Sequence, residues 1–222
     1  MGYGRNSLLL MKPSYNLIAG HSVERLAALS DGIFAFAMTL LVLDLHTPTR
    51  EAIHGERGLW LALGVLAPQM LVYLMSFLTL GIFWLGQQAQ LNLFERSDRH
   101  LTWIHIAFLF AVSLIPFSTK LLSEFIEYRV ALLLYWANIL LLGGVLYGSW
   151  LYARCGNFLK EGTPPEMDKA VRSRIVVAQS LYALGALLCL FNNYWSIAFI
   201  VLVQLNYAIA PSFRPRKESG PG

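Results

Sequence analysis

Six long apolar runs constrain this chain more than any other feature of its sequence. An α-helix needs about 20 mostly apolar residues to cross the hydrocarbon core of a bilayer, and all six runs are close to that length. Only 14% of the residues are charged, whereas soluble domains carry roughly 25%. We therefore expect an all-α membrane protein with six transmembrane helices per subunit. The runs cover approximately residues 23–46, 62–90, 101–122, 130–153, 172–191 and 194–211.

The basic residues predict the orientation of these spans. An even number of spans places both termini on one side of the membrane, and cytoplasmic loops are enriched in Lys and Arg. The side that holds the termini carries thirteen basic residues, namely Arg5, Lys12, Arg25, Arg96, Arg99, Arg154, Lys160, Lys169, Arg172, Arg174, Arg214, Arg216 and Lys217. The other side carries Arg50, Arg57, Lys120 and Arg129. We expect cytoplasmic termini, and this topology explains the net charge of +4 without a nucleic-acid partner.

The expected domain organisation is simple. Residues 1–22 form an N-terminal cytoplasmic segment, residues 23–212 the six-helix transmembrane domain, and residues 213–222 a C-terminal cytoplasmic tail. The sequence has none of the motifs GxxxxGK[ST], HExxH, CxxC or GxSxG, so we expect no enzyme, no metal site and no cofactor. The six-helix unit is not repeated, which implies several copies around an axis if the protein moves solutes. Gly144 and Gly148 have GxxxG spacing, a possible subunit contact.

One face of the first run combines residues suited to a pore wall. At about 100° per residue, Gly32, Phe36, Thr39 and Leu43 lie close together on a helix. Ordinary packing against a neighbouring helix explains such a face, with the Thr39 hydroxyl bonded to the backbone. Alternatively, copies of this helix surround an axis, and apolar constrictions bracket a ring of threonine hydroxyls. The residues alone leave both alternatives open.

A charged pair near the start of the first run requires partners, because charge within a membrane is costly. Arg25 and Asp31 are six residues apart, so they are not helical neighbours. Polar side chains of the second and third runs lie at similar depth and are candidate partners: Trp84, Gln87, Gln88 and His105. Such a network is either a static clamp between helices or, through His105, a pH-sensitive gate.

Three segments resemble the transmembrane protein 175 family of potassium channels, in its prokaryotic single-repeat form. RLAALSDGIFAFAMTLLVLDL, from Arg25, is similar to the family's first-helix signature of an arginine, three residues and Phe-Ser-Asp. YLMSFLTLGIFWLGQQ, from Tyr73, and LTWIHIAFLFAVSLIPFSTKLL, from Leu101, look like its second and third helices. Leu29 replaces the usual phenylalanine, and Gln87 and Gln88 stand where prokaryotic relatives commonly carry a histidine pair.

The resemblance implies a homotetramer in a lipid bilayer, with the first helix lining a central pore. By position, Phe36 corresponds to a hydrophobic constriction, Thr39 to a hydroxyl layer tied to potassium selectivity, and Leu43 to the next apolar layer. The resemblance also implies a polar network, formed by Arg25, Ser30 and Asp31, that holds the first helix against its neighbours.

The expected function is passive, potassium-selective conduction, with potassium as the permeant ion. By analogy with the family's single-repeat members, we expect an integral protein of a prokaryotic plasma membrane. Two alternatives remain at this stage. One is a proton-permeable channel or proton-coupled transporter that uses Asp31 and His105, and the other is a non-conducting membrane scaffold.

Overall fold

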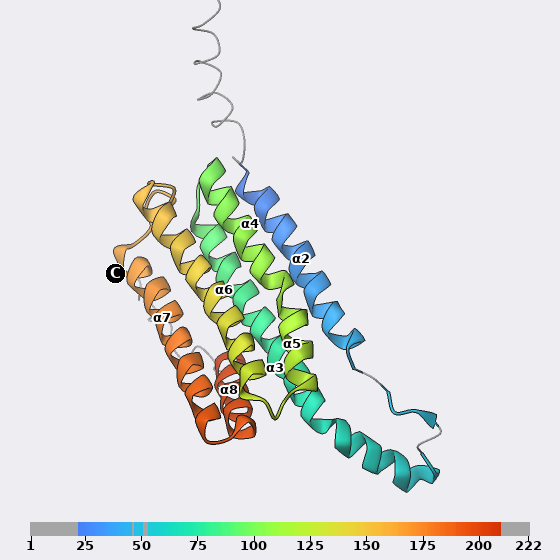
Figure 1. The fold of residues 1–222 in the computed structure, drawn as a ribbon. Coiled ribbons are helices and arrows are strands. Elements are labelled where there is room, and N and C mark those ends of the chain that lie inside the picture. Colours follow the sequence, from blue (N-terminus) through green and yellow to red (C-terminus); the bar gives the residue numbers. More distant parts are fainter. Residues whose placement is uncertain (1–21, 46, 51–52, 210–222) are drawn as a thin grey trace, which may run out of the picture.

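The chain folds into a bundle of antiparallel helices (Figure 1). The computed structural model describes residues 22–45, 47–50 and 53–209. The expected cytoplasmic tail and all of the N-terminal segment except Ser22 lie outside these residues. The helices are α2 (Val23–Leu43), α3 (Gly55–Leu93), α4 (Arg99–Ser113), α5 (Ile115–Glu124), α6 (Arg129–Cys155), α7 (Pro165–Leu187), the 3-10 turn η2 (Leu188–Leu190) and α8 (Asn193–Ile209).

Local signals explain where several helices begin and break. The Ser22 hydroxyl accepts a hydrogen bond from the Arg25 backbone N–H, and the Asp98 carboxylate accepts one from the Leu101 N–H, so both residues cap a helix. Pro165 is tolerated in the first turn of α7 because that position needs no N–H donor. Pro116 separates α4 from α5, and the expected single run over 101–122 therefore becomes two stacked helices.

Five helical segments of the described chain are long and apolar enough to cross a membrane. These segments are Val23–Leu43, Gly55–Leu93, Arg99–Glu124, Arg129–Cys155 and Pro165–Leu190. The sixth expected span corresponds to α8, which has 17 residues up to the end of the described region. The all-helical membrane architecture is thus as predicted, and α8 is the shorter partner of α7.

Helix α3 is much longer than the expected run over 62–90. It has 39 residues, and at 1.5 Å per residue it extends about 58 Å, whereas the hydrocarbon core is about 30 Å thick. Its first turns therefore project beyond the bundle, at the lower right of Figure 1. Trp60, Leu61 and Val65 in this projection are 73%, 68% and 78% exposed. The helix begins at Gly55, seven residues before the expected start of the run at residue 62.

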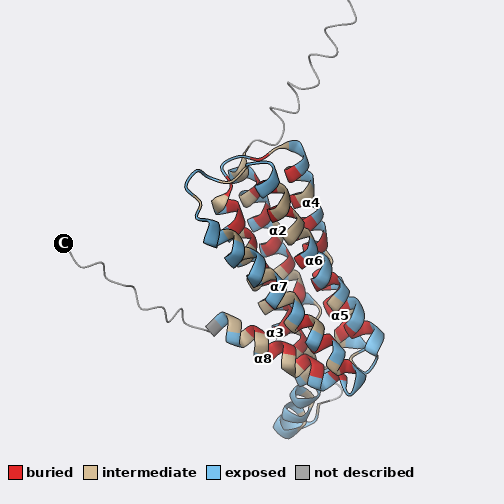
Figure 2. Cartoon of the chain, turned by 90° about the vertical axis from the view of Figure 1, so that its left-hand side faces the viewer, coloured by how far each residue is buried: buried red, intermediate tan, exposed pale blue. Residues whose placement is uncertain are grey.

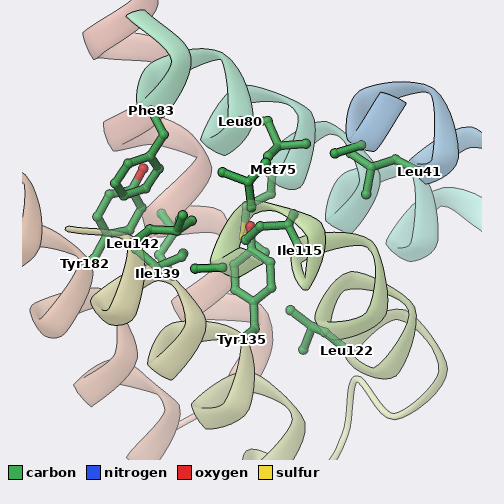
Figure 3. Close-up of a cluster of buried hydrophobic side chains, with 14 of the residues drawn as sticks. Leu41, Met75, Leu80, Phe83, Ile115, Leu122, Tyr135, Ile139, Leu142 and Tyr182 are labelled. Carbon is green, nitrogen blue, oxygen red and sulfur yellow. The ribbon is translucent and has the colours of Figure 1, made fainter. Parts of the chain in front are cut away.

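The bundle encloses an apolar core to which all the spans contribute. Figure 2 shows buried residues on the inward sides of the helices and exposed residues outside. Figure 3 shows part of the main cluster, in which Leu41, Met75, Ile115, Tyr135 and Tyr182 come from α2, α3, α5, α6 and α7. Most of the remaining exterior is apolar too, as expected of helices that contact lipid or other copies.

A chain of hydroxyl and amide groups crosses this core. The Gln204 side-chain amide donates hydrogen bonds to Thr79 Oγ1 at 2.7 Å and to Tyr182 OH at 3.2 Å. Thr79 Oγ1 is also 2.9 Å from Tyr135 OH, and Ser76 Oγ donates to the same phenol at 3.2 Å. All five side chains are at least 97% buried. This polar chain joins α3, α6, α7 and α8, and the sequence analysis did not identify it.

The glycines of α6 have different surroundings. A methyl group added to Gly143 would overlap the Gln179 side chain, so Gly143 permits close contact between α6 and α7 within one subunit. Gly144 and Gly148, the predicted GxxxG pair, have no heavy atom within 4 Å of such a methyl group. Within the described chain, therefore, the GxxxG pair makes no close helix contact.

Candidate functional site: an uncovered face of the first helix

The two faces of α2 differ sharply in their surroundings. Leu26, Ser30, Phe34, Ala37 and Leu41 are buried against the rest of the subunit. This series recurs every three or four residues and defines the inward face. The opposite face remains uncovered by the described chain, and its residues are Gly32, Phe36, Thr39 and Leu43.

The uncovered face has an apolar, polar, apolar order along the helix. Phe36 is 63% exposed and Leu43 is 72% exposed, with Thr39 between them. The Thr39 hydroxyl donates a hydrogen bond to the Phe36 backbone carbonyl at 2.8 Å. Its oxygen lone pairs consequently remain available as acceptors. Such an oxygen can contact a cation, while the two large apolar side chains can exclude water.

Hydrogen bonds fix the rotation of α2 against α3 in the N-terminal half of α2 and near the C-terminal end of α3. The Trp84 indole N–H and the Gln88 amide both donate to Asp31 Oδ1, at 2.7 Å and 2.6 Å. On the adjacent, buried side of the interface, the Gln87 amide donates to Ser30 Oγ at 2.9 Å. These five side chains form the α2–α3 clamp. Because Asp31 has two donors on α3, its charge is held beside the helix pair and not on the Phe36 face.

Ser30 completes its hydrogen bonding within the clamp. Its hydroxyl donates to the Leu26 carbonyl at 2.8 Å, which leaves the oxygen free to accept from Gln87. Both Ser30 and Gln87 are fully buried. The carbonyl oxygen Oε1 of Gln87 has no hydrogen-bond partner among the described residues. The clamp thus has a buried half at Ser30 and an exposed half at Asp31.

Two residues expected in this network lie elsewhere. Arg25 is exposed, and its side chain makes no hydrogen bond or ion pair within the described chain. His105 is buried, with its Nε2 3.4 Å from the Ser149 hydroxyl of α6 and its ring edge-on to Phe94. The reason is the rotation of α4, which turns His105 toward α6 and not toward Asp31. The position of His105 along its helix does not determine this rotation.

Sequence reasoning missed an ion pair at the other end of α2. Asp44, the C-cap residue of α2, lies 3.6 Å from Lys120 of α5. A signal was present in the sequence, because Asp44 and Lys120 lie near the C-terminal ends of the first and third apolar runs, 23–46 and 101–122, which cross the membrane in the same direction. Within the described residues no group of three or more His, Cys, Asp or Glu side chains is arranged to hold a metal ion.

Comparison with known proteins identifies the relatives of this arrangement. Residues 25–116, which include the uncovered face and the clamp, match the family model described as endosomal/lysosomal potassium channel TMEM175. A Streptomyces collinus protein named as a potassium channel is 28% identical over 88% of this chain and 96% of its own length. The chain is similar to TMEM175-family proteins over these residues. The resemblance inferred from the sequence is thereby confirmed.

A solved TMEM175-family structure supports the fold. It is the crystal structure of a lysosomal potassium-selective channel TMEM175 homologue from Chamaesiphon minutus, with a TM-score of 0.73 and 26% identity. The match covers 85% of this chain and 97% of that one. The family model and the bacterial relative are both named as ion channels, and ion channels are not a class of enzyme. Channels of this family are integral membrane proteins.

Vertebrate TMEM175 relatives match over a smaller share of their length. The chicken protein, named as an endosomal/lysosomal proton channel, is 32% identical over 51% of this chain and 24% of its own length. The bacterial and vertebrate relatives therefore carry different ion names, potassium and proton.

Proposed function

We propose that this protein is a passive, potassium-preferring cation channel in which four copies turn the Phe36 face of α2 toward a common axis. The observation that carries the proposal is the uncovered face itself. Gly32, Phe36, Thr39 and Leu43 form a stripe that no described part of the subunit covers, on a helix whose other face is fully packed. Bacterial relatives named as potassium channels support the choice of ion.

Each layer of the stripe has a role in this mechanism. Phe36 and Leu43 form apolar constrictions, from which water withdraws when the tube is narrow. A cation that enters such a constriction loses hydration, and the ring of Thr39 oxygens returns part of that coordination. The α2–α3 clamp sets the rotation of α2, so each of the four copies presents the same stripe. The proposed conducting unit is residues 23–212, with cytoplasmic termini, in a prokaryotic plasma membrane.

Ion flux into liposomes tests the proposal. Protein reconstituted with a potassium gradient should carry a cation current, and Thr39→Ala should reduce the preference for potassium over sodium several-fold. Ser113→Ala is a matched control, because Ser113 is also exposed and its hydroxyl donates to the carbonyl three residues before it. A wild type without flux, or an unchanged preference in Thr39→Ala, would contradict the proposal.

Proton conduction is the second candidate, and the proton-channel name of the vertebrate relatives favours it. In that case the Asp31 carboxylate carries the proton. Asp31→Asn is an informative variant because both clamp donors bind Oδ1, an atom that asparagine retains. With a pH dye in the same liposomes, proton uptake that this substitution abolishes would favour proton conduction. Potassium flux without proton uptake would favour the potassium channel.

A further inference from the structure

A cavity of about 340 Å³ lies between α3, α6, α7 and the end of α8. Its volume falls in the range of small-molecule sites, roughly 300–1,000 Å³. The described residues that line it include none from α2, so it is separate from the candidate pore face. Most of the lining is apolar, with Ile82 and Phe83 of α3, Leu146 of α6, and Ile175 and Ala178 of α7.

Two of the residues that line this cavity have a buried amide oxygen without a hydrogen-bond partner among the described residues. Gln90 is 99% buried, and its Oε1 accepts no hydrogen bond in the described chain. Gln179 donates through Nε2 to the Ile139 carbonyl at 3.3 Å, but its Oε1 is also without a partner. Buried polar atoms are nearly always satisfied, because an unpaired acceptor loses its hydration without compensation. Both oxygens accept only, so a matching ligand must supply donors such as hydroxyl groups.

The rim of the cavity carries a cation. Arg174 of α7 lies over the ring of Tyr207 of α8, with its guanidinium carbon 4.8 Å from the ring centre. Arg154 and Arg172 both pair with Asp168, whereas the described chain offers Arg174 no carboxylate. Arg174 is thus positioned to bind an anion at the entrance of the cavity.

Position along α7 places this cation at membrane-interface depth. Arg174 is the last charged residue of α7, and Ile175 begins the apolar part of the helix. From Arg174 to Tyr182, which also lines the cavity, a helix rises about 12 Å. The cavity therefore runs from the headgroup level into the hydrocarbon region, with charge at its entrance and apolar walls beyond.

We propose that the cavity holds an anionic phospholipid with hydroxyl groups on its head, such as phosphatidylglycerol. Arg174 binds the phosphate, the headgroup hydroxyls donate to the Gln90 oxygen, and an acyl chain fills the apolar space beside Ala178. This assignment does not depend on the ion that the protein conducts. The site is formed by α3, α6, α7 and α8. Lipid binding tests it, and ion flux does not.

Native mass spectrometry of the delipidated full-length protein, titrated with phosphatidylglycerol, provides the first test. We expect one tightly bound lipid per chain. Ala178→Phe fills the cavity and should weaken binding about tenfold or more, the factor that corresponds to 1.4 kcal/mol. Val177→Phe is the matched control, because Val177 is adjacent on α7 but 52% exposed and outside the cavity. Phosphatidylcholine with the same acyl chains should bind more weakly, and Arg174→Gln should remove that difference.

Photo-crosslinking of the wild type gives a result even where Ala178→Phe fails to fold. A phosphatidylglycerol with a diazirine in the middle of one chain should label the α7 peptide that contains Ala178, and unlabelled lipid should compete. Equal binding of both lipid classes would overturn the headgroup assignment. Labelling confined to other helices, or equal effects of Ala178→Phe and Val177→Phe, would overturn the site. A peptide of a second copy cross-linked over the cavity would show that the chain itself covers it.

Discussion

Phe36 and Thr39 are linked by the hydrogen bond from the Thr39 hydroxyl to the Phe36 carbonyl. Through this bond the threonine side chain is fixed relative to the backbone, and its oxygen lone pairs have a defined direction. Phe36 itself projects from the helix with 63% of its surface exposed. A side chain with that exposure contributes little to the packing of its own subunit, which makes it a suitable position for substitution.

Phe36→Ser should increase conductance. A small hydroxyl side chain wets the proposed constriction, so the energetic barrier to a hydrated cation falls. Single-channel recording in planar bilayers measures the effect as a larger unitary current or a higher open fraction. Leu202→Ser on α8 provides the control, because Leu202 is 66% exposed on another helix. A decrease in Phe36→Ser, or the same change in both variants, would show that Phe36 packs against a neighbour and does not line the pore.

Several pairings in the clamp follow from the sequence, and others do not. The antiparallel order of the first two spans places Asp31 level with Trp84 and Gln88, and the structure joins them. The same reasoning about depth failed for His105, since depth does not determine which way a side chain points around its helix. That direction depends on the packing of α4 against α6, which involves side chains far apart in sequence.

Hydropathy predicts where helices cross a membrane but not where they begin. The projection of α3 carries Glu56 and Arg57 in its first turn, so its start has no apolar signal. The helix nevertheless runs without a break from Gly55 into the apolar span, and it also continues through Pro68. The polar chain around Thr79 could not be predicted from the sequence either, because an isolated threonine or glutamine in an apolar run does not indicate its hydrogen-bond partner.

This polar chain should hold α7 and α8 against α3 and α6. Thr79→Val keeps the shape of the side chain but removes one of the two buried partners of the Gln204 amide and of the Tyr135 hydroxyl, which retain only Tyr182 and Ser76, respectively. We expect a loss of about 1–3 kcal/mol of stability. Thermal unfolding of the purified protein measures it as a lower midpoint. Thr39→Val makes the same chemical change at an exposed site and should leave the midpoint nearly unchanged. Equal midpoints for both variants would show that the polar chain does not contribute to stability.

At the scale of the whole molecule, one subunit leaves large apolar surfaces uncovered on several helices. Leu43 of α2 is 72% exposed, but many apolar side chains of α6 and α7 that suit contact with lipid are exposed as well. Exposure alone therefore does not say which helix lies at a symmetry axis. What distinguishes α2 is the order of its uncovered side chains, together with the clamp that fixes its rotation.

Cross-linking between copies tests this assembly directly. In a Cys155→Ser background, which removes the exposed native thiol, Leu43→Cys should give covalent dimers with a short bis-maleimide, because thiols of neighbouring copies then face one axis and each thiol reacts once. Leu41→Cys, which is 98% buried on the inward face, should give none. Leu140→Cys on α6, 45% exposed, distinguishes the axis from the periphery. Denaturing gels of membranes treated before solubilisation report the result. Dimers from Leu140→Cys without any from Leu43→Cys would place another helix on the axis, and the roles proposed for Phe36 and Thr39 would then fail together.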